Sequence, residues 1–413
     1  MHRPTDISKE VLDLGALGPM LVRGGLALGV VGVVSAVLFS IFAKGDGFER
    51  FAYSYLLNVT WVLSIALGAF FWLLVQHITR AAWSVVLRRV LEGIAGTLPV
   101  LVVLLVPIAL LVPQLYFWAD PEVAATDPLV KHKVAYLNTP FFIARLAFYG
   151  IFWAVASRWL FRASVGQDTD GDPQRSLRME RASTWMMFLF ALTATFAAFD
   201  LIMSLDAHWF STIFGVYFFA GCALSSMSFL AIVLWYLQAR GRIAHAITRE
   251  HYHDVGKLMF AFVVFWAYIA FSQYMLIWYA HIPEETGWFL RRQQEPWLWL
   301  SIALIFGHFF LPFLALISRV PKRRKGVLAL AGAYLLAIHW VDLYWLIMPE
   351  FGAHAHKGPK LGHHGPWFSV MDVLLLLGMV GFLVAAVAWR LRGCALVPVR
   401  DPRLPESLTF ENA

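Results

Sequence analysis

Ten long, charge-poor stretches recur along the chain, and they constrain its fold more than any other feature. Each has about 20 residues, the number that an α-helix needs to cross roughly 30 Å of hydrocarbon. Segments exposed to lipid must satisfy their own backbone hydrogen bonds, so we expect helices. The sequence therefore predicts an all-α integral membrane protein with ten transmembrane helices, at residues 24–43, 51–76, 91–118, 139–161, 182–205, 209–237, 256–280, 296–317, 327–347 and 368–389.

The composition favours the same class of protein. Hydrophobic residues make up 60% of the 413 residues and charged residues only 14%, which is too apolar for a soluble protein of this length. The net charge of +7 is attributed to membrane topology, so no nucleic-acid partner is expected. Membrane lipids are the expected surroundings.

The distribution of Lys and Arg predicts the orientation, because basic residues are retained in short cytoplasmic loops. Segments on the side of the N-terminus carry 24 of the 33 basic residues, the opposite loops carry 8, and Arg145 lies inside a span. We therefore expect both termini in the cytoplasm. The first span follows a mixed-charge leader without a small-residue cleavage site, so it is expected to remain as a helix.

Cysteine usage argues against redox groups held by this chain. Cys222 and Cys394 are the only two cysteines, so neither a disulfide nor a thiolate metal site is expected. The sequence has no CxxCH motif for covalent haem and no cysteine cluster for iron and sulfur. We expect no cofactor bound by this chain.

Two charged residues within spans form the first candidate pair. Arg145 and Asp200 lie at similar depths in the fourth and fifth spans, and an ion pair would relieve part of the burial cost of each. One interpretation is a structural clamp. The other makes Asp200 a proton acceptor, with Asp206 and His208 continuing a proton route outward.

A second candidate group lies in the eighth and ninth spans. His339 and Asp342 are three residues apart and so share one helical face, and His308 occupies the preceding span. A carboxylate one turn from a histidine can orient the ring or exchange a proton with it. Ligation of a b-type haem by the two histidines and simple polar packing are the alternatives.

A third group lies toward the cytoplasm, where His77 ends the second span and Glu92 begins the third beside two arginines. Interface positions of this kind are usually solvated. The functional alternative is a proton entry point, helped by residues of the next-but-one cytoplasmic bend. Polar residues of the seventh span could extend it as a hydrogen-bonded chain, or they could equally anchor the membrane interface. The helping residues are His251, His253 and Asp254, and those of the chain are Gln273, Tyr274 and Tyr279.

The loop before the last span contains four histidines, enough for a metal site in principle, but it is interpreted as a flexible contact loop. They are His354, His356, His363 and His364.

Several segments together resemble a known family: FFWLLVQHIT at 70–79, NTPFFIAR at 138–145, FDLIMSLD at 199–206 and FSQYMLIWY at 271–279. They resemble the NrfD-like membrane subunits, also called the polysulfide reductase NrfD-like family, of bacterial alternative complex III. That complex is a quinol:cytochrome c oxidoreductase. The similarity extends from the first span to the last and looks closest to the second of its two such subunits, the ActF type.

The resemblance implies two four-helix bundles flanked by single helices. The chain then divides into 1–50 (N-terminus and first helix), 51–205 (first bundle), 206–347 (second bundle) and 348–413 (outer loop, tenth helix and tail). A place in the bacterial inner membrane is also implied. The residues that the resemblance carries over are Arg145, Asp200, Asp206 and Gln273.

The resemblance further implies partners: a sister NrfD-like subunit, a periplasmic multihaem cytochrome and an iron–sulfur subunit. Haem c and the iron–sulfur clusters belong to those partners, and the sister subunit is the usual place of quinol oxidation. This chain is then expected to provide a proton route between Glu92 and the outer loops and to anchor the redox subunits. A quinol-binding site on this chain and a purely structural scaffold remain alternatives.

Overall fold

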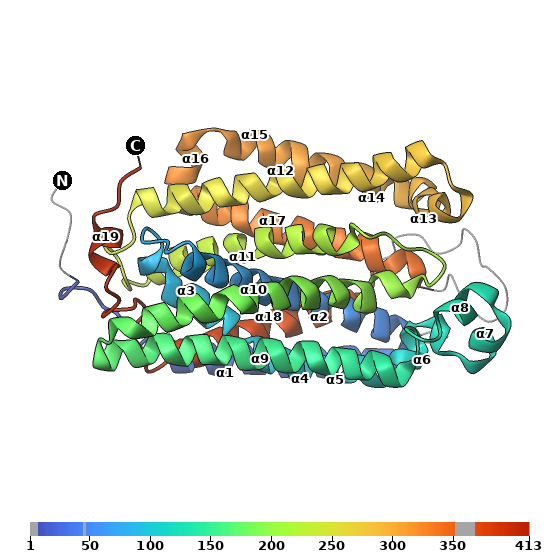
Figure 1. The fold of residues 1–413 in the computed structure, drawn as a ribbon, viewed down its shortest axis with the longest axis horizontal. Coiled ribbons are helices and arrows are strands. Elements are labelled where there is room, and N and C mark those ends of the chain that lie inside the picture. The colour runs from blue at the N-terminus through green and yellow to red at the C-terminus, as the bar shows by residue number, and fades with distance from the viewer. Residues whose placement is uncertain (1–6, 44–46, 352–367, 413) are drawn as a thin grey trace.

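The computed structural model describes residues 7–43, 47–351 and 368–412, and within these ranges the regular structure is helical throughout. Ten helical segments are long and apolar enough to cross a membrane, which confirms the predicted fold class. The helices lie roughly parallel in one elongated bundle (Figure 1). Both ends of the described chain lie at one end of this bundle, here called the termini end.

The fifth and ninth membrane-length segments end in short 3₁₀ turns, Met203–Leu205 and Met348–Glu350. Apart from these turns, the ten segments are built from fourteen helical elements. They are α1 (Leu17–Phe42), α2 (Gly47–Ile78), α3 to α5 (Val85–Ala95, Leu98–Leu104, Val106–Leu110), α9 (Thr139–Asp170), α10 (Pro173–Leu201), α11 (Phe214–Ala239), α12 (Arg249–Ala280), α14, η3 and α15 (Trp297–Leu304, Ile305–Phe310, Leu311–Ile317), α17 (Lys325–Ile347) and α18 (Val370–Leu391). Short helices connect them: α6 (Val112–Leu115), α7 (Pro121–Thr126), α8 (Pro128–Lys133), α13 (Pro283–Gln293) and α16 (Arg319–Arg323). A last short helix, α19 (Leu404–Leu408), lies in the C-terminal tail after α18.

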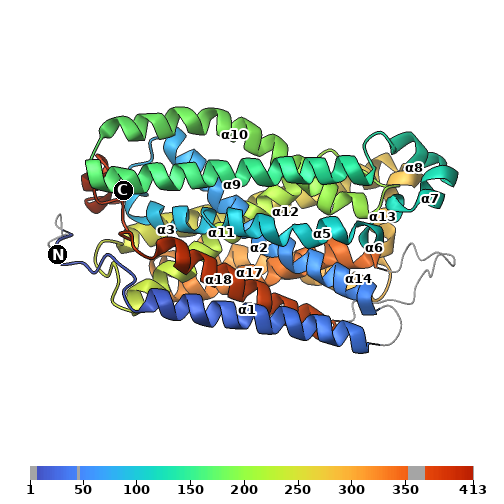
Figure 2. The ribbon, with the colours of Figure 1, turned by 90° about the horizontal axis from the view of Figure 1, so that it is seen from below.

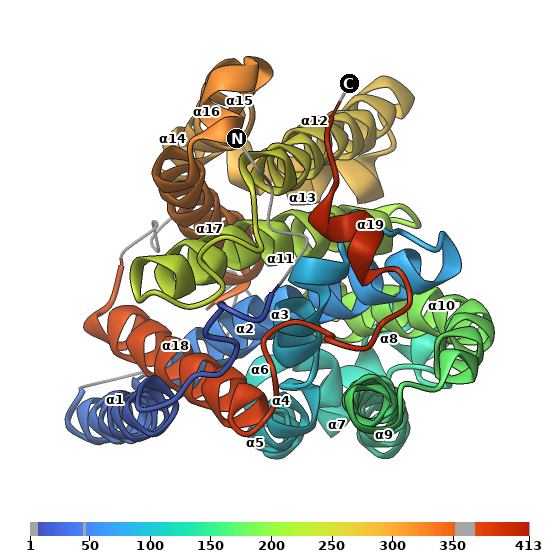
Figure 3. The same cartoon turned by 90° about the vertical axis from the view of Figure 1, so that its left-hand side faces the viewer.

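Helix α2 is the central element of the bundle. Its most apolar stretch is 89% buried, against 28% for α1 and 22% for the α14–α15 segment, and it contacts α10, α11, α17 and α18 (Figure 3). Gly68 allows the closest approach, because a Cβ there would lie 1.8 Å from the carbonyl oxygen of Cys222 on α11. The division into two bundles stays a prediction, since α2 packs against helices of both.

Helices α1 and α18, far apart in the sequence, lie side by side along one edge (Figure 2). A Cβ at Gly25 would lie 2.6 Å from the carbonyl oxygen of Gly381, and one at Gly32 would lie 2.6 Å from the carbonyl oxygen of Leu374. Small residues let two helix backbones approach closely in lipid, where tight packing drives association. The first and last spans are therefore held together.

The connection between the fourth and fifth spans is shorter than expected from hydropathy. The predicted spans end at residue 161 and begin again at residue 182, but α9 continues to Asp170 and α10 begins at Pro173. The turn uses Gly171 at a φ of +68°, and Asp172 caps α10. Hydropathy marks only the part of a helix that lipid covers, so it cannot show that a charged segment continues the same helix.

The loop histidines His354, His356, His363 and His364 lie outside the described residues.

Candidate functional site

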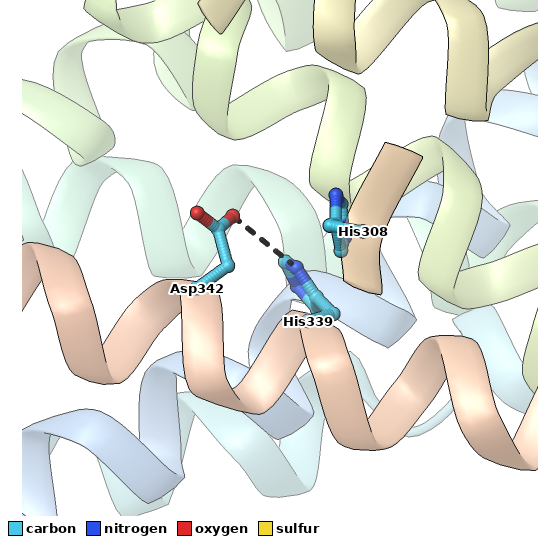
Figure 4. A group of neighbouring side chains, drawn as sticks. All are labelled: His308, His339 and Asp342. Carbon is cyan, nitrogen blue, oxygen red and sulfur yellow. Dashed lines mark ion pairs between the residues drawn. The ribbon is translucent and has the colours of Figure 1, made fainter. Parts of the chain in front are cut away.

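The structure brings His308, His339 and Asp342 together inside the bundle (Figure 4). One ring nitrogen of each histidine and one carboxylate oxygen all lie within 4.8 Å of one another. Each residue is at most 1% exposed. His339 Nδ1 lies 3.9 Å from an Asp342 carboxylate oxygen, as their spacing of three residues on α17 predicted. This group is called the His–Asp cluster below.

His308 enters the cluster from an irregular turn of its helix. Residues Ile305–Phe310 form a π-helical turn between α14 and α15. Pro312 explains part of this irregularity, because it has no N–H to bond the carbonyl of His308, four residues before it, and its ring clashes with that carbonyl. The hydroxyl of Tyr334 on α17 donates to the carbonyl of Gly307 at 2.8 Å. π-Helical turns occur frequently at functional sites.

His339 is held between α2 and α11. Its Nε2 lies 2.9 Å from the hydroxyl oxygen of Ser64 on α2. Gly221 on α11 provides space for the ring, since a Cβ at this position would lie 2.5 Å from His339 Cε1. The imidazole therefore has a fixed orientation set by two neighbouring helices.

Asp342 accepts hydrogen bonds on both carboxylate oxygens. The hydroxyl of Tyr217 on α11 donates to one oxygen, and the indole N–H of Trp266 on α12 donates to the other at 3.2 Å. The ring of Trp266 also packs edge-on against His308, with ring centroids 3.8 Å apart. The roles of Ser64, Tyr217 and Trp266 could not be predicted, because nothing in the sequence shows which helices cross beside α17.

Three nitrogens of the His–Asp cluster have no hydrogen-bond partner among the described residues. They are Nδ1 and Nε2 of His308 and Nδ1 of His339. Buried polar atoms nearly always have a partner, which can be protein, ordered water or an ion. The cluster therefore has free capacity to accept or donate protons.

Metal and haem binding fit the cluster less well than proton exchange. Two imidazoles and a carboxylate form a known zinc ligand set. The ligand atoms around a tetrahedral zinc ion lie about 3.4 Å from one another. The candidate ligand atoms of the cluster, which lie within 4.8 Å of one another, would have to move closer together. A haem between His308 and His339 would need a flat slot. The ring of Trp266 already packs edge-on against His308, with centroids 3.8 Å apart, so part of the space around this imidazole is occupied.

The predicted pairing of Arg145 and Asp200 is confirmed. Arg145 donates to both carboxylate oxygens of Asp200, at 2.8 and 2.9 Å. The hydroxyl of Tyr149 also donates to Asp200 at 3.0 Å, and the Arg145 guanidinium stacks 3.8 Å from the ring of Tyr136. A carboxylate with this many donors is firmly held, which favours the clamp interpretation.

The side chains of Asp206 and His208 do not continue a hydrogen-bonded chain outward from Asp200. Each of them pairs with a residue of another segment. Asp206 pairs with Arg291, which also binds Glu350 at 2.9 Å. His208 Nε2 lies 2.6 Å from a carboxylate oxygen of Asp127, at the start of α8. Ion pairs therefore lie at the end of the bundle opposite the termini, and the sequence did not predict the partners Asp127, Arg291 and Glu350.

The contact between Asp127 and His208 affects the pKa of the Asp127 carboxyl group. Partial burial by itself would raise the pKa of Asp127. The hydrogen bond with His208 and those from the backbone N–H groups of Val130 and Leu129 outweigh burial and hold the pKa below its usual value.

The interpretation of His77 and Glu92 as solvated interface residues is wrong, since they are only 4% and 1% exposed. Glu92 pairs with Arg88 at 3.2 Å and with Arg89 at 2.8 Å. The C-terminal tail covers this end of the bundle, and its Asp401 pairs with Arg88. A hydropathy pattern cannot reveal a tail that folds back over a distant helix end.

The expected hydrogen-bonded chain in the seventh span is not formed. Gln273 is buried, and its Nε2 has no partner among the described residues. Tyr274 instead accepts a hydrogen bond from Gln293 at 2.7 Å, and Tyr279 is 84% exposed. Helical geometry separates these side chains, because positions five apart do not share a face.

In comparisons with known proteins, no family model and no curated protein sequence matches this chain.

Proposed function

We propose that this chain is the proton-conducting membrane subunit of a respiratory quinol:cytochrome c, or quinol:terminal oxidase, complex in the bacterial inner membrane, with both termini cytoplasmic. Quinol oxidation by neighbouring subunits drives a protonation change within its bundle. The motifs that resemble NrfD-like subunits of alternative complex III support the assembly. The His–Asp cluster supports the role of the chain within it.

The observation that carries the proposal is the buried position of Asp342 and the residues that surround it. Asp342 is 1% exposed, lies beside two histidines with unpaired nitrogens, and belongs to a helix of membrane length. Ionisable groups inside a membrane are costly and usually mark a transport or relay function. A carboxylate and an imidazole within a few ångströms can exchange a proton directly or through one water.

The two ends of the proposed route are the buried charge networks at the ends of the bundle. Glu92 and His77 lie at the termini end, and Asp206 and Glu350 lie at the opposite end. About 20 Å of helix α2 separates Ser64 from His77, as 13 residues at 1.5 Å each require. Ordered water would have to complete the route across this distance.

The test compares proton release with electron transfer in proteoliposomes that contain the whole complex. Asp342→Asn removes the titratable group while keeping its shape, so we expect quinol oxidation to continue with fewer protons released per electron. The matched control is Asp372→Asn, which changes another fully buried carboxylate, paired with Arg50 at 2.5 Å and outside the cluster. An unchanged proton-to-electron ratio in Asp342→Asn at normal turnover would refute the proposal.

A scaffold role predicts a different result. Anchoring of periplasmic redox subunits requires surfaces at the ends of the bundle and no titration at its centre. If Asp342→Asn and Asp372→Asn reduce only the amount of assembled complex, and not the ratio of protons to electrons, the scaffold role is favoured.

One observation supports quinol binding as a second candidate function. A cavity of about 350 Å³ opens near the end of the bundle opposite the termini. Aromatic rings and a few polar groups line it, among them Tyr136, Trp209, Phe210, Lys133 and Asp206. Small-molecule sites often combine apolar walls with few polar groups at this size. A photoreactive quinone tests this role, which requires labelled peptides from these segments and is refuted if only the sister subunit is labelled.

A further inference from the structure

A cleft at the termini end contains three arginines that the proton route does not use. Its volume is about 200 Å³, and it is lined by Trp159, Arg162 and Ala163 of α9 and by Arg175 and Arg178 of α10. The two helices lie side by side at the periphery of the bundle (Figures 2 and 3). This cleft is called the arginine cleft below.

The arginine cleft keeps a positive charge after its internal ion pairs are counted. Arg175 pairs with Asp170 at 2.6 Å, and Arg178 pairs with Asp172 at 2.9 Å. Arg162 makes no ion pair with any residue that the structure describes. Three guanidinium groups against two carboxylates leave a net charge of +1 and several N–H donors without an acceptor.

A glycine of α9 determines where the Arg175 side chain lies in the cleft. The Arg175 guanidinium crosses α9 at Gly166, where a Cβ would lie 2.8 Å from one of its nitrogens. Any larger residue at 166 would push this side chain away. The glycine therefore lets Arg175 lie against the same face of α9 from which Arg162 projects, one turn earlier.

An apolar stripe leads from the arginine cleft along the bundle surface. On α9 the exposed side chains at helical spacing are Phe148, Ile151, Val155 and Trp159, which are 40–63% exposed. On α10 they are Trp185, Phe188, Leu192 and Phe196, which are 39–66% exposed. Exposed apolar side chains of a membrane-length helix face lipid chains, and tryptophan marks the headgroup level. The cleft therefore lies where a phospholipid places its phosphate.

We propose that the arginine cleft binds the phosphate of an anionic phospholipid whose acyl chains lie along the α9–α10 stripe. Arginine matches phosphate oxygens with paired N–H donors, and basic pockets between membrane helices bind anionic headgroups. The net positive charge selects an anionic lipid over a zwitterionic one. The bound lipid fixes the ends of α9 and α10 against each other at the membrane surface.

The experiment is a lipid titration of the purified full-length chain, followed by native mass spectrometry. The probes are phosphatidylglycerol, phosphatidylcholine and inorganic phosphate. Arg162→Gln removes the arginine without an ion pair, so it leaves the α9–α10 turn intact. The control is Arg319→Gln, the same charge change at an exposed position on α16, across the bundle from α9.

We expect the unaltered chain and Arg319→Gln to retain phosphatidylglycerol more strongly than phosphatidylcholine. Arg162→Gln should weaken phosphatidylglycerol retention by about fivefold, the effect of one interfacial arginine, and leave phosphatidylcholine retention unchanged. Equal retention of both lipids, or equal retention in both variants, would overturn the proposal. So would full displacement of the lipid by inorganic phosphate, because the site would then recognise the free anion.

Discussion

The hydroxyl oxygen of Ser64 lies 2.9 Å from Nε2 of His339, which joins the most buried helix of the bundle to the His–Asp cluster. This contact uses one ring nitrogen of His339 and leaves Nδ1 turned toward Asp342, 3.9 Å away. A side chain on α2 therefore determines which nitrogen is available for proton exchange.

Ser64→Ala should destabilise the folded chain in detergent by about 1–3 kcal/mol, because it leaves a buried nitrogen of His339 without its partner. Thermal or denaturant unfolding in detergent measures the change. Ser225→Ala is the control, since the Ser225 hydroxyl bonds only the carbonyl of Cys222 in its own helix. Equal losses for the two variants would mean that the contact with His339 adds nothing.

Arg145→Gln should destabilise the folded chain by about 3–5 kcal/mol, because the Asp200 carboxylate would stay buried without its cation. The same unfolding measurement applies. Asp200→Asn separates the two interpretations of this pair. A clamp requires lost stability with normal proton release per electron, whereas a proton acceptor requires reduced proton release from the fraction that still folds.

Gly68→Ala should destabilise the bundle by about 1–3 kcal/mol or more, because its Cβ would lie 1.8 Å from the backbone oxygen of Cys222. α2 and α11 would have to move apart. Gly24→Ala on α1 is the matched control, since a Cβ there meets no atom within 4 Å. That variant should be neutral or slightly stabilising, and an equal loss in both would contradict the close approach of α2 and α11.

The pair of Asp127 and His208 should make the α7–α8 region sensitive to acid. The pKa of Asp127 is lowered from its model-compound value of 3.8, so its stabilising contribution is complete above about pH 4 and is lost as the pH falls through the lowered value. Protection of the Pro121–Lys133 amides against hydrogen exchange, relative to the intrinsic rate at each pH, should therefore fall steeply below about pH 4. His208→Gln should weaken this dependence, and an unchanged profile would show that the pair does not hold the segment.

Periodicity and hydropathy predict what depends on a single helix. They located all ten spans, and they placed His339 and Asp342 on one face because residues three apart always share it. They also suggested that Arg145 and Asp200 pair, since two opposite charges at one depth in lipid have few other partners.

Contacts that depend on how distant segments fold together could not be predicted. Tyr217 and Trp266 reach Asp342 from two other helices, and no local pattern shows that those helices meet there. Glu92 looked solvated because the C-terminal tail that buries it lies about 300 residues away in the sequence. The π-helical turn at His308 was also missed, although Pro312 was a visible signal for a break.

The proposed proton route requires that Asp342 change its protonation state when the complex oxidises quinol. Infrared difference spectroscopy of the intact complex, recorded before and after quinol addition, measures this directly through the carboxylic-acid C=O band. We predict a difference band in the unaltered complex that is absent from Asp342→Asn and retained in Asp372→Asn. An identical difference spectrum in the unaltered complex and in Asp342→Asn would show that Asp342 keeps its protonation state, which would refute the proposed proton route.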